Sequence, residues 1–221
     1  MLKRFLLRAL GAVVGLPKGA ASHLPAISNH VDSILGEPKQ HLHENYSPDI
    51  HVDLMHYAAT ADRGFQYLVT SGMSDRPMTD GGDPVEEPHM ELVLALPSDW
   101  DISAEGFKNP AVFQPVKLMK QLARYPHANR TYFAKGHTVQ IGDEPLLQPM
   151  EAVMLMPPLL VPELSEPLVL ANGERIRFMG LYLLHEDELK LKLEDVEQLV
   201  GFLAEHGIRE MYDLKRASVC R

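Results

Sequence analysis

Cysteine is almost absent from this sequence: the only one among 221 residues is Cys220, beside the C-terminus. A single thiol excludes a disulfide framework within the chain, and it excludes a zinc site built from several thiolates. Chains that fold without disulfides are typical of reducing compartments. We therefore expect a cytoplasmic protein.

Basic charge is also scarce, because 21 lysines and arginines face 30 aspartates and glutamates, for a net charge of −9. Binding to the phosphate backbone of nucleic acid requires basic patches, so this balance argues against a nucleic-acid partner. An acidic surface instead suits a basic protein partner.

Long apolar runs and phosphate-binding loops are missing as well. No segment contains the roughly 20 consecutive apolar residues that are needed to cross a membrane. Neither of the glycine-rich motifs G-x-x-x-x-G-K-[ST] and G-x-G-x-x-G occurs in the sequence. We expect no transmembrane span, no nucleotide and no other cofactor.

The first 22 residues differ from the rest of the chain. Apolar residues recur there at helical spacing, and the basic residues lie off that stripe (Lys3, Arg4 and Arg8). A signal peptide requires an uninterrupted apolar centre, which Arg8 breaks. We expect an amphipathic extension over residues 1–22, followed by one domain over 23–221. A signal peptide, or contact of residues 1–16 with a membrane surface, is the alternative.

Strand and helix patterns are mixed along the remainder. Alternating or near-continuous apolar residues predict strands at 49–55, 65–70, 90–96, 131–134, 137–141, 152–156, 168–170 and 176–184. Helical spacing predicts helices at 27–35, 110–125 and 194–206. Pro126 is expected to end the second helix, and Asn172-Gly173 predicts a hairpin. This order predicts an α+β fold with a mixed, mostly antiparallel sheet flanked by helices.

The segment FQYLVTSGMSDRPM (65–78) joins a strand to a polar, glycine-bearing corner. Such corners present side chains at a sheet edge, where binding or catalysis is often found. Gly72-Met-Ser74 partly resembles the nucleophile elbow G-x-S-x-G, but the second glycine is missing. A hydrolase based on Ser74 is therefore an alternative, with a base and its orienting carboxylate drawn from His137, His185 and Asp213.

Histidines and aspartates are densest between residues 41 and 56 (His41, His43, Asp49, His51, Asp53 and His56). Zinc requires three or four such groups that converge on one point. No motif such as H-E-x-x-H accompanies them, so a solvated polar strand face is the simpler interpretation. A hydrolase with a histidine-bound metal stays as a second form of the enzyme alternative.

Several segments together resemble the suppressor of fused (SUFU) domain family. They are YLVTSGMSDRPM (67–78), ELVLALP (91–97) with Trp100, PVKLMKQLARYP (115–126), Thr131-Tyr132, Gly136-His137-Thr138, IRFMGL (176–181) and residues 213–216. Their order matches that of the family over residues 27–217. One departure is Gln114-Pro115, where the family often has Trp-Pro. The second domain of the animal members has no counterpart, so the chain resembles the single-domain bacterial type.

The resemblance implies a non-enzymatic module that binds another protein. Animal members clamp a short segment of Gli-type transcription factors as an added strand, and some bacterial members are thought to be immunity proteins against toxins. We expect a partner protein, plausibly a basic toxin domain, to contact the corner and its neighbours. Tyr67 and Met73 would supply apolar contact, Asp75 and Glu91 charge complementarity, and His137 a polar edge group, with Ser74 part of the same surface.

Overall fold

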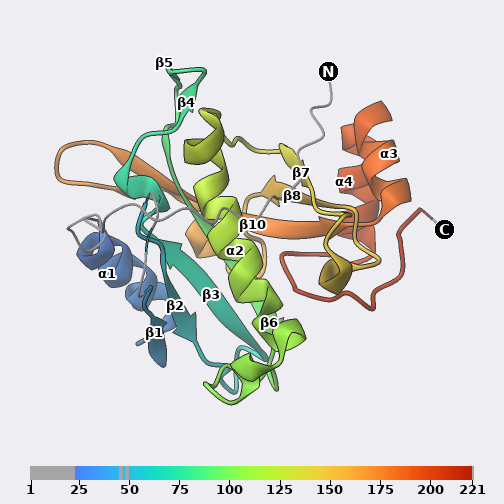
Figure 1. Ribbon diagram of the computed structural model, residues 1–221, viewed down its shortest axis with the longest axis horizontal. Coiled ribbons are helices and arrows are strands. Elements are labelled where there is room, and N and C mark those ends of the chain that lie inside the picture. Colours follow the sequence, from blue (N-terminus) through green and yellow to red (C-terminus); the bar gives the residue numbers. More distant parts are fainter. Residues whose placement is uncertain (1–22, 45–46, 48–49, 221) are drawn as a thin grey trace.

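Figure 1 shows the computed structural model, which describes residues 23–44, 47 and 50–220. The predicted extension over residues 1–22 lies outside the described residues. An eight-stranded sheet forms the middle of the molecule, with the strand order β1-β2-β3-β6-β10-β8-β7 and β9 beside β10.

The strands of this sheet are β1 (Gln40–Leu42), β2 (Asp53–Tyr57), β3 (Phe65–Ser71), β6 (His89–Pro97), β7 (Thr138–Gln140), β8 (Ala152–Met156), β9 (Leu168–Val169) and β10 (Arg175–Leu184). A separate hairpin consists of β4 (Thr79–Asp80) and β5 (Asp83–Pro84). The helices are α1 (Leu24–Leu35), α2 (Pro110–Asn129), α3 (Glu186–Glu194) and α4 (Val196–Glu205). Short 3₁₀ helices are η1 (Met73–Asp75), η2 (Gly106–Lys108), η3 (Pro145–Leu147) and η4 (Pro162–Ser165).

Pairing in the sheet is antiparallel except between β6 and β10, which run parallel. The sheet is therefore mixed and mostly antiparallel, and with the four α-helices of the described residues it confirms the predicted α+β class. The predicted hairpin is present too, because β9 and β10 pair antiparallel across the turn at Gly173, whose φ is +87°. Glycine adopts this left-handed backbone without the steric cost that a side chain would add.

Alternation of side chains along the strands divides the core between two faces of the sheet. Leu68 of β3 and Leu94 of β6 belong to the cluster that includes the buried stripe of α2. Tyr67 and Val69, one position away on β3, belong to the cluster that packs against α1. Successive residues of a strand point to opposite faces, so α2 covers one face and α1 the other.

Helices α3 and α4 lie at the end of the molecule away from α1 (Figure 1). They cover the same face as α1, because Phe178 of β10 packs in the α1 cluster and Tyr182, four residues on, packs in the cluster of α3 and α4. There Met154 of β8 and Tyr182 of β10 pack with Leu199 and Leu203 of α4. The sheet is therefore covered by α2 on one face. On the other face α1 covers one end, and α3 and α4 cover the other end.

Three predicted elements differ in the structure. Helix α2 continues through Pro126 and ends at Asn129, where it is capped by Arg130, whose φ is +50°. No strand forms at 131–134, where Phe133 is instead buried with its ring stacked 5.7 Å from that of Tyr125. The strand expected at 49–55 begins only at Asp53. At 131–134 the burial of Phe133 against Tyr125 takes the place of strand pairing.

None of the described helices is long and apolar enough to span a bilayer.

Candidate functional site

The corner after β3 is built around one buried carboxylate, that of Glu91 on the neighbouring strand β6. It accepts hydrogen bonds from the Thr70 hydroxyl (2.6 Å), the Gly72 amide (3.0 Å), and the amide and hydroxyl of Ser74 (3.0 and 2.7 Å). Gly72 has a φ of +116°, a conformation that favours glycine and turns the chain into η1. The corner is therefore folded around Glu91.

Glu91 is fully buried, and no cation is paired with it in the described part of the chain. Burial raises the pKa of Glu91, and the four donors offset that rise only in part. A carboxylate with this environment holds a loop to the sheet, because its donors all come from the segment 70–74.

Three histidines surround the same corner, each from a different element. His89 of β6 contacts the Ser74 carbonyl through Nδ1 (2.6 Å), and His127 of α2 contacts the Met73 carbonyl through Nε2 (3.0 Å). A carbonyl only accepts, so these two ring nitrogens carry the protons. His23, at the start of α1, lies 3.3 Å from the Ser74 hydroxyl. The corner thus joins α1, α2 and β6.

The structure corrects the surface role expected for four of the six predicted contact residues. Tyr67, Met73, Ser74 and Glu91 are each 0% exposed, so their side chains offer a partner no surface. The Tyr67 hydroxyl donates to Glu210 (2.8 Å), and burial followed by the Glu210 charge raises the pKa of that phenol well above its usual value. These residues hold the fold together.

Asp75 and His137 are the two predicted contact residues that keep partly exposed side chains. Asp75 ends η1, where its carboxylate accepts a hydrogen bond from the His23 amide (3.0 Å). His137 precedes β7, with its ring 5.3 Å from that of Tyr132. Three strands (β6, β10 and β8) separate β3 from β7, so Asp75, which follows β3, and His137, which precedes β7, lie far apart along the sheet.

Strand β7 ends the sheet, and β8 is its one neighbour among the described strands. The Leu155 amide donates to His137 (2.9 Å), and the Ile141 amide donates to Glu151 (2.8 Å). In antiparallel pairing the residues between such bonded positions point their N–H and C=O groups the other way. The backbone groups of Thr138 and Gln140 therefore face away from the sheet.

The residues considered for hydrolysis are not assembled. Ser74 donates its hydroxyl to Glu91 and is buried. His185 contacts the Arg216 carbonyl (3.0 Å), and Asp213 accepts from the Lys215 amide (2.8 Å). Neither contacts Ser74. The histidine that does, His23, lies beside a hydroxyl that is fully buried and donates its proton to Glu91, so no predicted base faces an accessible nucleophile among the described residues.

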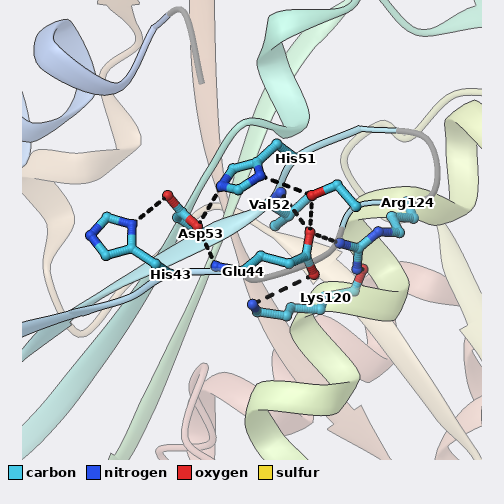
Figure 2. A network of polar contacts seen from close by, with 8 residues as sticks. His43, Glu44, His51, Val52, Asp53, Lys120 and Arg124 are labelled. Atoms are coloured by element: carbon cyan, nitrogen blue, oxygen red, sulfur yellow. Dashed lines mark hydrogen bonds and ion pairs between the residues drawn. The ribbon is translucent and has the colours of Figure 1, made fainter. Parts of the chain in front are cut away.

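The histidine-rich segment folds into the polar network that Figure 2 shows, centred on Asp53. Asp53 is buried and lies 2.9 Å from both His43 Nδ1 and His51 Nε2. Burial would raise the pKa of Asp53, but the hydrogen bonds from His43 and from the Glu44 amide outweigh it and leave that pKa below its usual value. The polar face predicted as solvated is thus partly internal.

Glu44 connects this network to α2. Its carboxylate is paired with Arg124 and lies 3.6 Å from Lys120, as Figure 2 shows. The Ser47 hydroxyl bridges Glu44 (2.7 Å) and His51 (2.8 Å). The network therefore fastens the connection between β1 and β2 to the helix that covers the sheet.

The described residues contain no group of three or more side chains arranged to hold a metal ion. His56 faces Gln66 (2.6 Å) and Gln40 (3.3 Å), away from the Asp53 network. Asp49, the remaining candidate aspartate, lies outside the described residues.

Sequence reasoning missed two further buried carboxylates. Glu210 accepts from Tyr67, Tyr182 and the amides of Leu159 and Leu160, at 2.8 to 3.3 Å. Glu188 is paired with Arg216. The donors to Glu210 lie at least 28 residues away along the chain, so no local pattern marks it. Glu188 has one local donor, the His185 amide, but its cation Arg216 is 28 residues away.

Comparisons with known proteins agree with this architecture. The family described as suppressor of fused protein (SUFU) matches residues 48–217. A SUFU homologue from Neisseria gonorrhoeae FA 1090 superposes with a TM-score of 0.61 at 18% identity, covering 88% of this chain and 95% of that one. The Sufu–Fu complex superposes with a TM-score of 0.62 at 13% identity, covering 91% and 93%.

A search of the curated proteins found no match. The two solved structures are less than 25% identical to this chain, so they establish the fold and not a shared partner. The family match covers most of the sequence and includes the corner, α2 and β10. The chain therefore belongs to the suppressor of fused (SUFU) family.

Proposed function

We propose that this chain is a non-enzymatic module that binds another protein by adding an extended segment of the partner to the edge of β7. The observation that carries the proposal is the outward direction of the Thr138 and Gln140 backbone groups at the end of the sheet. An unpaired row of N–H and C=O groups is a template for strand addition. The similarity to the fold in the Sufu–Fu complex supports a protein partner.

His137 is proposed as a side-chain contact of this edge, since it immediately precedes β7 and is partly exposed. Asp75 follows β3, three strands away from β7 in the sheet. Its proposed contact therefore requires a partner that extends beyond the added strand. Tyr67, Met73, Ser74 and Glu91 act behind the surface by fixing the strands and the corner.

We further propose a basic partner, plausibly a toxin domain that this protein neutralises in the cytoplasm. The net charge of −9 supports a partner of opposite charge. Electrostatic attraction between two proteins weakens with added salt, so the association rate should fall steeply as ionic strength rises. A toxin gene beside the gene for this protein would identify the partner to use.

A photo-crosslinking amino acid at Gln140 tests the position of the surface. We expect it to capture the partner in cells, whereas the same amino acid at Asn172, on the exposed hairpin turn, should not. Binding of the captured partner is then measured with Thr138→Pro and Thr138→Ala. Proline removes an outward N–H without removing a bond to β8, and alanine keeps it.

Weaker binding by Thr138→Pro alone would support strand addition at β7. Equal binding by the wild type and both variants, or capture only from Asn172, would contradict it. Circular dichroism and thermal unfolding of each variant separate loss of binding from loss of fold.

A further inference from the structure

A pocket lies on the side of the molecule that holds α1, with a volume of about 680 Å³. Its walls come from the last turn of α1, the connection between β2 and β3, and the segment around η4. The apolar lining residues are Ile34, Leu35, Phe65, Leu160 and Val161. The polar lining residues are Ser33, Thr60, Asp62, Arg63 and Glu163, so an apolar wall and a polar wall face the same space. Its volume lies within the 300 to 1,000 Å³ range of ligand sites.

One cation lines this pocket, the guanidinium of Arg63. It donates to the Leu35 carbonyl (3.2 Å) at the end of α1 and to the Ala58 carbonyl (2.7 Å) after β2. These two bonds hold the guanidinium in place, and they also satisfy a carbonyl that the helix end leaves unpaired. The side chain therefore has a fixed position at the pocket wall.

Arg63 lacks a carboxylate partner within the described part of the chain, and its buried Nε has no hydrogen-bond acceptor there. Burial lowers the pKa of this guanidinium, which reflects a charge taken partly out of water. A partly desolvated guanidinium gains most from a carboxylate, since it can donate two parallel hydrogen bonds to one. Because Nε is buried, such bonds would come from the N–H groups of Nη1 and Nη2 that do not bond Leu35 and Ala58.

Two acidic residues, Asp62 and Glu163, also line the pocket, and both are exposed. Exposed charges are screened by solvent, so they do not replace an ion pair with Arg63. The same screening weakens their repulsion of an anion, and that repulsion is smallest for a ligand with one negative charge. The pocket therefore suits a single carboxylate attached to an apolar group.

We propose that this pocket binds the C-terminal residue of a peptide, with its carboxylate on Arg63 and an apolar side chain against Phe65 and Leu160. A chain terminus carries one such carboxylate next to its last side chain, and its capture is a recurring form of peptide recognition. The site is separate from the β7 edge, because Arg63 precedes β3 and β7 lies at the other end of the sheet.

The probe is the peptide acetyl-Gly-Gly-Ser-Leu, compared with the same peptide as its C-terminal amide. Binding to the full chain is followed by NMR of ¹⁵N-labelled protein. We expect the acid to shift the amide signals of Ser33, Thr60, Phe65 and Leu160. We expect the amide to bind about tenfold more weakly, because it loses a charge-assisted bond worth about 1.4 kcal/mol or more.

Arg63→Gln should remove the preference for the acid, Arg63→Lys should keep part of it, and Arg175→Gln, at an exposed arginine outside the pocket, should leave it unchanged. Because Arg63 also donates to two carbonyls, Arg63→Gln could disturb the fold. We therefore add two variants at Ser33 that leave Arg63 unchanged. Ser33 is an exposed residue of the lining. Ser33→Lys should strengthen binding of the acid several-fold, and Ser33→Glu should weaken it.

Equal affinity for acid and amide, or no shifts at the pocket, would overturn the proposal. Shifts produced there by inorganic phosphate but not by the peptide acid would also overturn it, since the site would then select another anion. N-acetyl-leucine, a free acid without a peptide chain, should bind more weakly than the peptide acid. Equal binding of the two acids would contradict recognition of a chain terminus.

Discussion

The Tyr67 hydroxyl donates a 2.8 Å hydrogen bond to the Glu210 carboxylate, joining two buried residues that are 143 positions apart. Glu210 lies where the C-terminal segment runs beside β6, with the Ala95 amide bonded to the Glu210 carbonyl (2.8 Å). The residue that the sequence offered as a surface contact is thus an internal tie between β3 and the end of the chain.

Replacing Glu210 with glutamine should destabilise the fold strongly. The NH₂ group of the glutamine side chain would face O–H or N–H groups that now donate to the carboxylate. Those buried donors would be left without an acceptor, at a cost of about 1–3 kcal/mol each. The measurement is the free energy of unfolding in urea. Glu205→Gln, an exposed glutamate on α4, is the control, and a change in Glu210→Gln no larger than the control would contradict the role assigned to Glu210.

A second test of the same contact uses Gly180 of β10. A Cβ at Gly180 would lie 2.8 Å from the Cβ of Glu210, which is closer than two such carbons approach. Gly180→Ala should therefore lower the free energy of unfolding by about 1–3 kcal/mol. Gly201→Ala provides the control, because nothing lies within 4 Å of a Cβ there and a helical alanine should stabilise slightly.

Ser74→Ala should lower stability through Glu91. The variant removes the hydroxyl that donates to the buried carboxylate at 2.7 Å, at an expected cost of about 1–3 kcal/mol. Ser33→Ala, at an exposed serine, should have little effect. The wild-type protein should also resist labelling by a serine-reactive fluorophosphonate, and stoichiometric labelling of Ser74 would favour the hydrolase interpretation instead.

The buried His56 should make the protein less stable in mild acid. Burial lowers the pKa of His56, so the unfolded chain binds a proton at a higher pH than the folded one. Well above pH 6.5 the imidazole is neutral in both states, so His56 causes no loss of stability there. As the pH drops from about 6.5 toward the folded-state pKa, the free energy of unfolding falls by at most about 1.4 kcal/mol per pH unit. Urea unfolding at pH 7.5 and 5.5 measures it.

His56→Gln should flatten this pH dependence, because glutamine has no proton to gain. His206→Gln, at an exposed histidine on the end of α4, should keep the wild-type slope. If His56→Gln and the wild type lose stability in parallel between pH 7.5 and 5.5, the acid sensitivity comes from other groups.

Arg216→Met should be more damaging than the loss of a surface charge. Arg216 pairs with Glu188, which is 0% exposed and also accepts from the amides of His185 (2.8 Å) and Val219 (2.9 Å). Burial alone would raise the pKa of Glu188, but Arg216 and these amides lower it below its usual value. Removing the cation leaves a buried charge, at a cost of about 3–5 kcal/mol.

The lowered pKa of Glu188 also sets how its contribution to stability depends on pH. A carboxylate with a lowered pKa adds stability above its unfolded pKa, and that stability is lost as the pH falls through the folded value. The variant Arg216→Met should therefore lose less stability than the wild type between pH 5 and pH 3. Arg175→Met is the control for both measurements, and it should behave as the wild type does.

The sequence located those elements whose residues carry their own pattern. Alternation of apolar residues was enough for β3 and β6, and Asn172-Gly173 for the hairpin between β9 and β10, because these signals arise from neighbours along the chain. The prediction that Pro126 ends α2 was wrong, because a proline is tolerated in the last turn of this helix, which Arg130 caps. The segment 131–134 misled because Phe133 is apolar for packing against Tyr125 and not for strand pairing.

The candidate site was harder, because a carboxylate in a sequence looks like a surface group. Glu91, Glu188 and Glu210 are buried, and each is stabilised by donors that only the folded chain brings to it. Asp53 likewise is buried on the polar face where alternation had placed it, and His43 and His51 contact it there.

By itself, then, the sequence determined the family, the α+β class and the place of the corner that follows Phe65–Ser71. Local periodicity and turn chemistry depend only on residues that are neighbours along the chain, so they can be recognised without the fold. Only the tertiary structure decided that Tyr67, Met73, Ser74 and Glu91 face inward at that corner, while Asp75 and His137 keep some exposure. The reason is physical: burial of a polar group depends on partners that lie far away in sequence, and those distances exist only in the fold.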